Sequence, residues 1–134
     1  MTLAVIDTNI LVSAFWSRNG TPAKILALVQ AGRLKPCFDS RILSEYREVL
    51  LRPRFGFSTD EVETVLHLLK DKGLDVLPSP LHVVFPDESD RMFYEVAKYC
   101  GAKLITGNQK HFPQDPDVVT AAEFMEMCSL AGGS

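Results

Sequence analysis

The 134-residue sequence lacks several features that mark specialised classes of protein. No apolar stretch approaches the ~20 residues that a membrane-spanning helix needs. No basic segment precedes the first apolar run, which argues against a secretory signal. Basic residues do not outnumber acidic ones, and the formal net charge is −3. A global basic field that attracts nucleic acids is therefore absent, and any such binding must use a local patch.

Cysteine and histidine are scarce and follow no ligand pattern. The three cysteines are an odd number, and no two of them form a CxxC pair. Isolated cysteines in apolar surroundings are typical of small buried side chains in a reducing compartment, so we expect a cytoplasmic protein. The three histidines are scattered as well, which argues against a zinc site.

The sequence instead has the composition and the regular order of a globular domain. It is 46% hydrophobic and 23% charged, as in ordinary soluble proteins. Short apolar runs alternate with helix-like segments along the whole length, a pattern that predicts a parallel sheet with helices on both faces. We expect one α/β domain over residues 1–130 and a flexible tail at 131–134. The predicted strands are 1–6, 35–38, 74–77, 83–85, 103–106 and 118–119.

The first nine residues, MTLAVIDTN, show where chemistry is expected. An apolar run ends directly at Asp7, as in a buried strand that places a carboxylate at the lip of a sheet. Ligands of open parallel sheets bind just beyond the carboxyl ends of the strands, and these ends share one edge. Polar residues follow four of the predicted strands: Asp7 and Asn9; Asp39 and Ser40; Asp87, Glu88 and Asp90; and Asn108.

Helical periodicity separates the acids of the helices into two groups. In the helix that starts at Ser40, Glu45 borders the apolar face and Glu48 points to solvent. In the helix that starts after Pro86, Asp90 borders the apolar face in the first turn, and Glu95 points away. Asp39 and Asp87 occupy positions typical of helix N-caps.

Asp7, Glu45 and Asp90 are therefore expected to converge, with Asn108 nearby. Three neighbouring carboxylates repel one another, and some of their pKa values would rise. A hard divalent cation relieves that repulsion, and Mg²⁺ or Mn²⁺ prefers carboxylate, carbonyl and water oxygens. The sequence thus predicts a Mg²⁺ or Mn²⁺ site.

The sequence resembles the PIN-domain family of metal-dependent ribonucleases over nearly its whole length. The motifs that carry the resemblance occur in the family's order: VIDTNIL at 5–11, SEY at 44–46, DESD at 87–90 and LITGN at 104–108. The stretches HFP at 111–113 and TAAEF at 120–124 resemble a branch described as toxins of toxin–antitoxin modules.

The resemblance implies a PIN-like three-layer α/β/α sandwich with a central, mainly parallel sheet. It implies an endoribonuclease that hydrolyses RNA phosphodiester bonds, is frequently a homodimer and is often inhibited by an antitoxin protein. Carried over by residue, the metal-binding acids of the family fall on Asp7, Glu45 and Asp90. The fourth acidic position falls on Asn108, whose amide adds no charge, so we expect one firmly bound ion.

Several other polar residues are candidates for positioning water or phosphate. Asn9, Thr106 and Asn108 are expected near the attacking water. The candidates for phosphate contacts are Lys110, Arg18, Arg41 and Arg47. Arg52 and Arg54 extend a local basic cluster that we interpret as a solvated helix face.

Two other functions stay open at this point. A phosphoacceptor signalling domain also places acids at the carboxyl edge of a parallel sheet and binds Mg²⁺, although the paired acid and the lysine typical of such domains are missing. The second alternative is an inactive PIN-like module that binds RNA or protein. The neutral Asn108 at the fourth acidic position of the family motivates this hypothesis.

Overall fold

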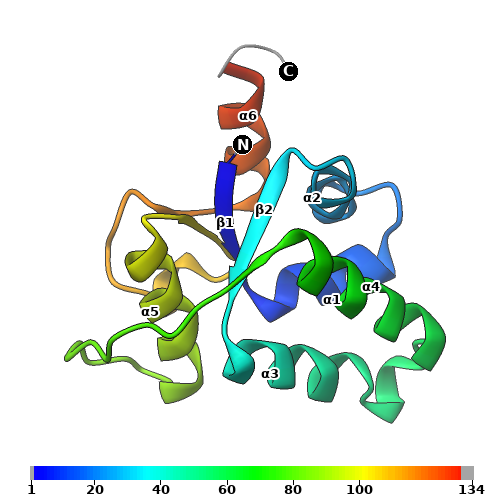
Figure 1. Cartoon of the computed structure of the whole chain (residues 1–134), viewed down its shortest axis with the longest axis horizontal. Helices are drawn as coiled ribbons and strands as arrows, with labels where there is room; N and C mark the ends of the chain where they lie inside the picture. Colours follow the sequence, from blue (N-terminus) through cyan, green and yellow to red (C-terminus); the bar gives the residue numbers. More distant parts are fainter. Residues whose placement is uncertain (1, 131–134) are drawn as a thin grey trace.

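The computed structural model describes residues 2–130 and contains a fully parallel sheet (Figure 1). The order of the strands is β3-β2-β1-β4-β5, and every neighbouring pair is parallel. The strands are β1 (Thr2–Ile6), β2 (Leu34–Phe38), β3 (Leu74–Asp75), β4 (Lys103–Ile105) and β5 (Val118–Val119). The side chains of Ala4, Val5 and Ile6 are fully buried, which explains why the apolar run of β1 occupies the centre. The predicted tail, 131–134, lies outside the described residues.

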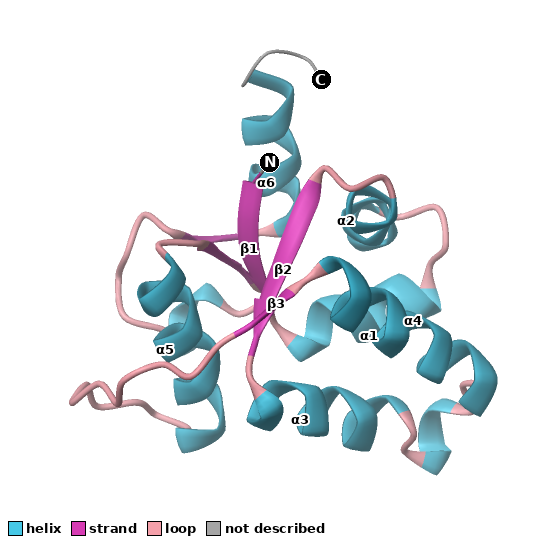
Figure 2. Ribbon diagram, in the orientation of Figure 1, coloured by secondary structure: helices cyan, strands magenta, loops and turns pink. Residues whose placement is uncertain are grey.

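Helices cover both faces of the sheet. They are α1 (Thr8–Trp16), α2 (Thr21–Gln30), α3 (Ser40–Leu50), α4 (Thr59–Lys72), α5 (Arg91–Cys100) and α6 (Ala121–Leu130). Helix α5 lies on one face, and α1, α2 and α4 lie on the other (Figure 2). Helix α3 lies beyond the carboxyl ends of β1 and β2 (Figure 1). The predicted three-layer α/β/α architecture is confirmed. None of the helices within residues 2–130 combines the length and the apolarity that crossing a membrane requires.

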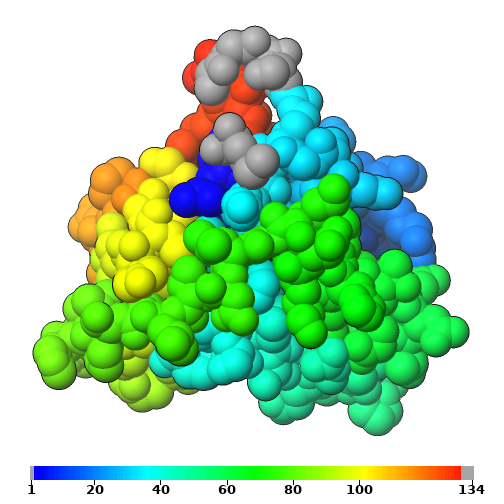
Figure 3. All heavy atoms as spheres, viewed as in Figure 1, coloured from blue at the N-terminus to red at the C-terminus, as the bar shows by residue number. Residues whose placement is uncertain are grey.

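The predicted strand at 83–85 is wrong. Residues 76–87 form an irregular segment that crosses one face of the molecule from the α4 side to the α5 side (Figure 3). The carbonyl groups of Leu81 and Val83 accept hydrogen bonds from the Arg91 guanidinium and not from a neighbouring strand. Prolines at 78, 80 and 86 remove backbone donors from this stretch, so it cannot form a regular ladder.

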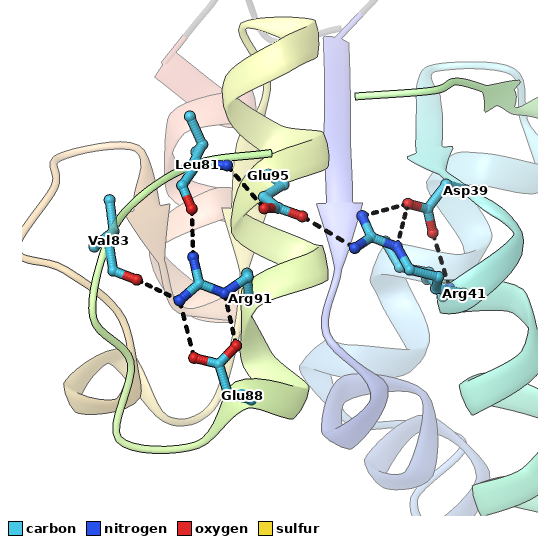
Figure 4. A network of polar contacts seen from close by, with 8 residues as sticks. Asp39, Arg41, Leu81, Val83, Glu88, Arg91 and Glu95 are labelled. Atoms are coloured by element: carbon cyan, nitrogen blue, oxygen red, sulfur yellow. Dashed lines mark hydrogen bonds and ion pairs between the residues drawn. The ribbon is translucent and has the colours of Figure 1, made fainter. Parts of the chain in front are cut away.

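Glu95 joins both this segment and α3 to α5. The sequence predicts that Glu95 points away from the apolar face, but its side chain is only 4% exposed. It accepts hydrogen bonds from the Leu81 N–H at 2.9 Å and from Arg41 Nη1 at 3.0 Å (Figure 4). Arg41 also donates to Asp39 Oδ2 at 2.7 Å, and Asp39 Oδ1 caps α3 as predicted. One guanidinium therefore joins the start of α3 to α5.

Replacing Glu95 by alanine should destabilise the protein by roughly 2–3 kcal/mol, because the partly buried Leu81 N–H would lose its acceptor and the Arg41 guanidinium would lose one of its two carboxylate partners. The free energy of unfolding in urea measures this loss. Glu126→Ala on the exposed side of α6 is the control, with an expected change within about 0.5 kcal/mol. Equal changes in the two variants would contradict the buried network.

Candidate active site

The carboxylate of Asp7 is held between the ends of the two central strands. Asp7 follows β1 and is 6% exposed. Its N–H donates to the carbonyl of Ile105 in β4 at 2.9 Å, and its Oδ2 accepts from Thr106 Oγ1 at 2.7 Å. From α3, the buried Tyr46 hydroxyl donates to the carbonyl of Ile6, the residue before Asp7. The strand end that carries Asp7 is thus fixed from both neighbouring elements.

This environment makes Asp7 a weak acid. Burial raises its pKa to about 6 from 3.8, although the hydrogen bond from Thr106 opposes the shift. The negative charges of Asp90 and Glu45 raise the pKa of Asp7 further.

Glu45 reaches the same region from α3. Its Oε2 accepts a hydrogen bond from Thr8 Oγ1 at 2.7 Å, which joins α3 to the first turn of α1. Glu48, one turn along α3, is exposed and forms an ion pair with Arg52 at 3.3 Å. The helix faces therefore agree with the predicted placement of Glu45 towards the pocket and Glu48 towards solvent.

Asp90 carries the least satisfied polar atom of the region. It ends the 3-10 turn Glu88–Asp90, which Asp87 caps as predicted. Its Oδ2 is buried but has no hydrogen-bond partner, and His111 Nδ1 lies 3.6 Å away. Burial raises the pKa of Asp90, the charges of Asp87 and Glu45 add to this, and His111 opposes it. A buried carboxylate oxygen without a partner is unfavourable, and a bound cation would satisfy it.

The predicted site residues Asp7, Glu45, Asp90 and Asn108 line one cleft of about 450 Å³. Within residues 2–130, however, no three His, Cys, Asp or Glu side chains form a close metal-binding cluster. The acids line one cleft but do not form a compact cluster. Their all-oxygen character and the unpartnered oxygen of Asp90 nevertheless fit a hard divalent cation.

The neutral positioning candidates take different places. Asn9 lines the cleft, and its Oδ1 accepts from the Gly107 N–H at 3.3 Å. Thr106 is fully buried behind Asp7 and also accepts from the Asn108 N–H at 3.0 Å. Thr106 therefore orients the carboxylate and the following loop.

Four basic candidates for phosphate contacts lie away from the cleft lining. Lys110 borders a separate hollow with Phe112 and Pro113. The other three form ion pairs with acids of the protein: Arg18 with Glu61, Arg47 with Glu63, and Arg41 with Asp39 and Glu95.

The cleft is also lined by residues that the sequence did not single out as functional. They are Arg52, Arg54 and Phe55, around the 3-10 turn Pro53–Phe55 that follows α3. The only signal in the sequence was the basic cluster, which was interpreted as a solvated face. The stretch is too short for helical periodicity to indicate a direction.

Comparison with protein families identifies this arrangement. Residues 3–110 match the family model described as PIN domain. The chain belongs to the PIN domain family. PIN domains are generally nucleases. Each of the four motifs that resemble the family contributes a residue to the cleft: Asp7, Glu45, Asp90 and Asn108.

This PIN domain is similar to one further protein in sequence and to one in fold. The uncharacterized protein MJ1680 of Methanocaldococcus jannaschii is 31% identical over 108 residues, which are 78% of this chain and 70% of the relative. The fold is also similar to a chain in the crystal structure of VapBC2 from Rickettsia felis bound to a DNA fragment from their promoter. That match has a TM-score of 0.57 and 16% identity, and it covers 89% of this chain and 97% of the other.

The raised pKa of Asp7 predicts a pH-dependent stability for this PIN domain. Because the folded state holds the proton more tightly than the unfolded chain, the free energy of unfolding should fall as the pH rises from about 4 to about 6. Asp7→Asn replaces the carboxyl group by an amide that does not titrate, so it removes this loss of stability. In EDTA near pH 7.5, the variant should be more stable than the wild type by as much as roughly 3 kcal/mol, with little difference near pH 4.

Urea unfolding at several pH values measures the difference between the two proteins. Asp71→Asn on the exposed face of α4 is the control, with an expected change within about 0.5 kcal/mol. An Asp7→Asn variant that is less stable at neutral pH would contradict the burial of an uncompensated charge.

Proposed function

We propose that the protein is a metal-dependent endoribonuclease that hydrolyses RNA phosphodiester bonds. The observation that carries the proposal is the buried, unpartnered Oδ2 of Asp90 in the cleft that Asp7 and Glu45 also line. A cleft that concentrates uncompensated carboxylates favours a divalent cation, and membership of the PIN family makes a nuclease the best-supported use of such an ion.

Asp7, Glu45 and Asp90 would hold Mg²⁺ or Mn²⁺. When bound, the ion would polarise the scissile phosphate and lower the pKa of the attacking water. Asn108 lines the cleft with an amide in place of a further acid, which favours one firmly held ion.

The protein's own residues prepare the acids for this role. Thr106 and Thr8 each donate to one carboxylate at 2.7 Å, so Asp7 and Glu45 are oriented before any ligand arrives. Asn9 braces the loop after β4 through the Gly107 N–H and keeps Asn108 at the rim. Preorganised ligands of this kind lose little freedom when they bind an ion or a phosphate.

We further propose that the protein is the toxin of a toxin–antitoxin module. The motifs at 111–113 and 120–124 and the fold shared with a chain of a VapBC2 complex support this proposal. The partner would be an antitoxin protein that blocks the cleft. A homodimer and a cytoplasmic location stay predictions of the sequence.

Asp7→Asn should abolish Mn²⁺-dependent cleavage of RNA while the variant keeps the circular dichroism spectrum of the wild type and still unfolds cooperatively. EDTA should abolish cleavage by the wild type, and Mn²⁺ at about 100 times its Kd should stabilise the wild type by ~2.7 kcal/mol. Gel analysis of labelled RNA and thermal melting provide the two measurements.

Undiminished cleavage by Asp7→Asn would remove this site from the mechanism. RNA binding without cleavage in Mn²⁺ would favour the inactive PIN-like module. A trapped acyl phosphate on Asp7 would favour the phosphoacceptor domain.

Glu45→Gln and Glu48→Gln form a matched pair on the same helix. Loss of the carboxylate that faces the cleft should lower the cleavage rate by roughly 100-fold, because a charged ligand becomes a neutral amide. Glu48→Gln should change the rate less than about threefold, since Glu48 is exposed. Rates at saturating Mn²⁺ test the pair, and the reverse order would contradict the assignment of the helix face.

A further inference from the structure

One part of the cleft lining combines positive charge with planar groups. It consists of Arg52, Arg54 and Phe55, which we call the arginine–aromatic wall. They follow α3: Arg52 directly precedes the 3-10 turn Pro53–Phe55, and Arg54 and Phe55 lie within it, so the three residues present one local surface.

The planar groups of this wall continue into a stack. The Arg54 guanidinium carbon lies 5.0 Å over the centroid of the Phe55 ring. Phe55 in turn stacks on Phe57 with centroids 5.3 Å apart and an interplanar angle of 12°. Trp16 contacts both rings edge-on, at 5.9 and 5.1 Å, and its side chain is 61% exposed. The wall is therefore backed by aromatic rings up to the surface.

The charges of the wall are largely uncommitted. Within residues 2–130, Arg54 has no acidic side chain at ion-pair distance, and Arg52 has only the exposed Glu48. Arg18, Arg41 and Arg47, by contrast, have close acidic partners. With a net charge of −3 and four acids in the cleft, the protein needs such a local cationic surface to admit an anionic chain.

We propose that the arginine–aromatic wall binds an unpaired nucleobase of the RNA, next to the phosphate that is cleaved. The base stacks on the face of the Arg54 guanidinium that is turned away from Phe55, which supports the guanidinium from its other side, and Arg52 contacts the adjoining phosphate. Aromatic rings and guanidinium planes are the groups on which proteins stack unpaired bases. This inference rests on the proposed function for the identity of the polymer as RNA.

The cleft favours this ligand over a segment of another protein. Acids and cations both line it, whereas an amphipathic protein segment would require a mainly apolar groove. A base with its phosphate matches both parts of the wall: a π-face for the Arg54 guanidinium that Phe55 supports, and an anion for Arg52.

Binding can be measured without cleavage, in EDTA, by the fluorescence anisotropy of a short labelled RNA. We expect Phe55→Ala to weaken binding by about 5- to 100-fold, the effect typical of losing one stacked base. Phe55→Tyr should retain the affinity. Phe55→Leu keeps apolar volume in the stack but removes the π-face, and it should weaken binding as Phe55→Ala does.

Arg54→Lys keeps the positive charge but removes the planar guanidinium, so it should also weaken binding. The matched controls are Tyr99→Ala, an exposed aromatic on α5, and Arg33→Lys before β2. Neither control residue lines the cleft, and neither variant should change the affinity.

An abasic position in the RNA provides the decisive comparison. In the wild type, one abasic position should lower the affinity as much as Phe55→Ala does, and combining the two changes should cause no further loss. Trp16 is the single tryptophan of the chain and contacts Phe55, so its fluorescence should change on binding intact RNA and change less with the abasic RNA.

Three results would overturn the proposal. The first is unchanged RNA affinity in Phe55→Ala and Phe55→Leu, and the second is strictly additive losses of affinity when Phe55→Ala is combined with the abasic RNA. The third is a loss of affinity in Phe55→Ala that is equally large for a duplex RNA of the same sequence. Loss of binding to a protein partner without any loss of RNA affinity would assign the wall to protein docking and overturn it as well. Because the binding assay needs no catalysis, inactivity in Mn²⁺ leaves this test intact and counts only against the proposed function.

Discussion

The hydrogen bond from Thr106 to the buried carboxylate of Asp7 is the interaction on which the candidate site depends. It requires that β1 and β4 lie side by side in one register, with Ile6 paired to Ile105, so that both polar residues emerge at the same edge. The register in turn requires an apolar carboxyl-terminal half of β1, because Ala4, Val5 and Ile6 are buried on both faces of the sheet. Helix α3 and the turn before α5 then bring Glu45 and Asp90 to the cleft beside the ends of β1 and β4.

This arrangement concentrates unfavourable electrostatics where a ligand can relieve them. Asp7 has a raised pKa, and Asp90 keeps a buried oxygen without a partner. Elsewhere the protein satisfies its buried charges, as with Glu95, which accepts from both Leu81 and Arg41. The contrast separates an ion-pair network that supports the fold from acids that the fold leaves uncompensated, and such strain is typical of functional sites.

The features that local patterns encode were predictable from the sequence. An apolar run that ends at Asp7 predicts its place at the sheet edge, and helical periodicity predicts that Glu45 and not Glu48 faces the cleft. The burial of Glu95 was not predictable, because its partner Arg41 lies 54 residues away. The predicted strand at 83–85 fails for a similar reason, since Arg91 takes the carbonyl groups that a ladder would use. The sequence indicates a solvated face for Arg52 and Arg54 and gives Phe55 no role. Their place in the lining of the cleft was not predictable, because a short turn has no periodicity that indicates a direction.

The position of β1 beside β4 also has a consequence during synthesis of the chain. Asp7 is made first, yet the threonine that orients it follows 99 residues later. Until then β1 lacks one of its two neighbours, and Asp90 and Asn108 at the rim of the cleft are also late arrivals. Closing so distant a contact is slow relative to local helix formation. A chain interrupted before β4 therefore carries Asp7 and Glu45 without a completed cleft. The cleft can form only after most of the domain has been synthesised.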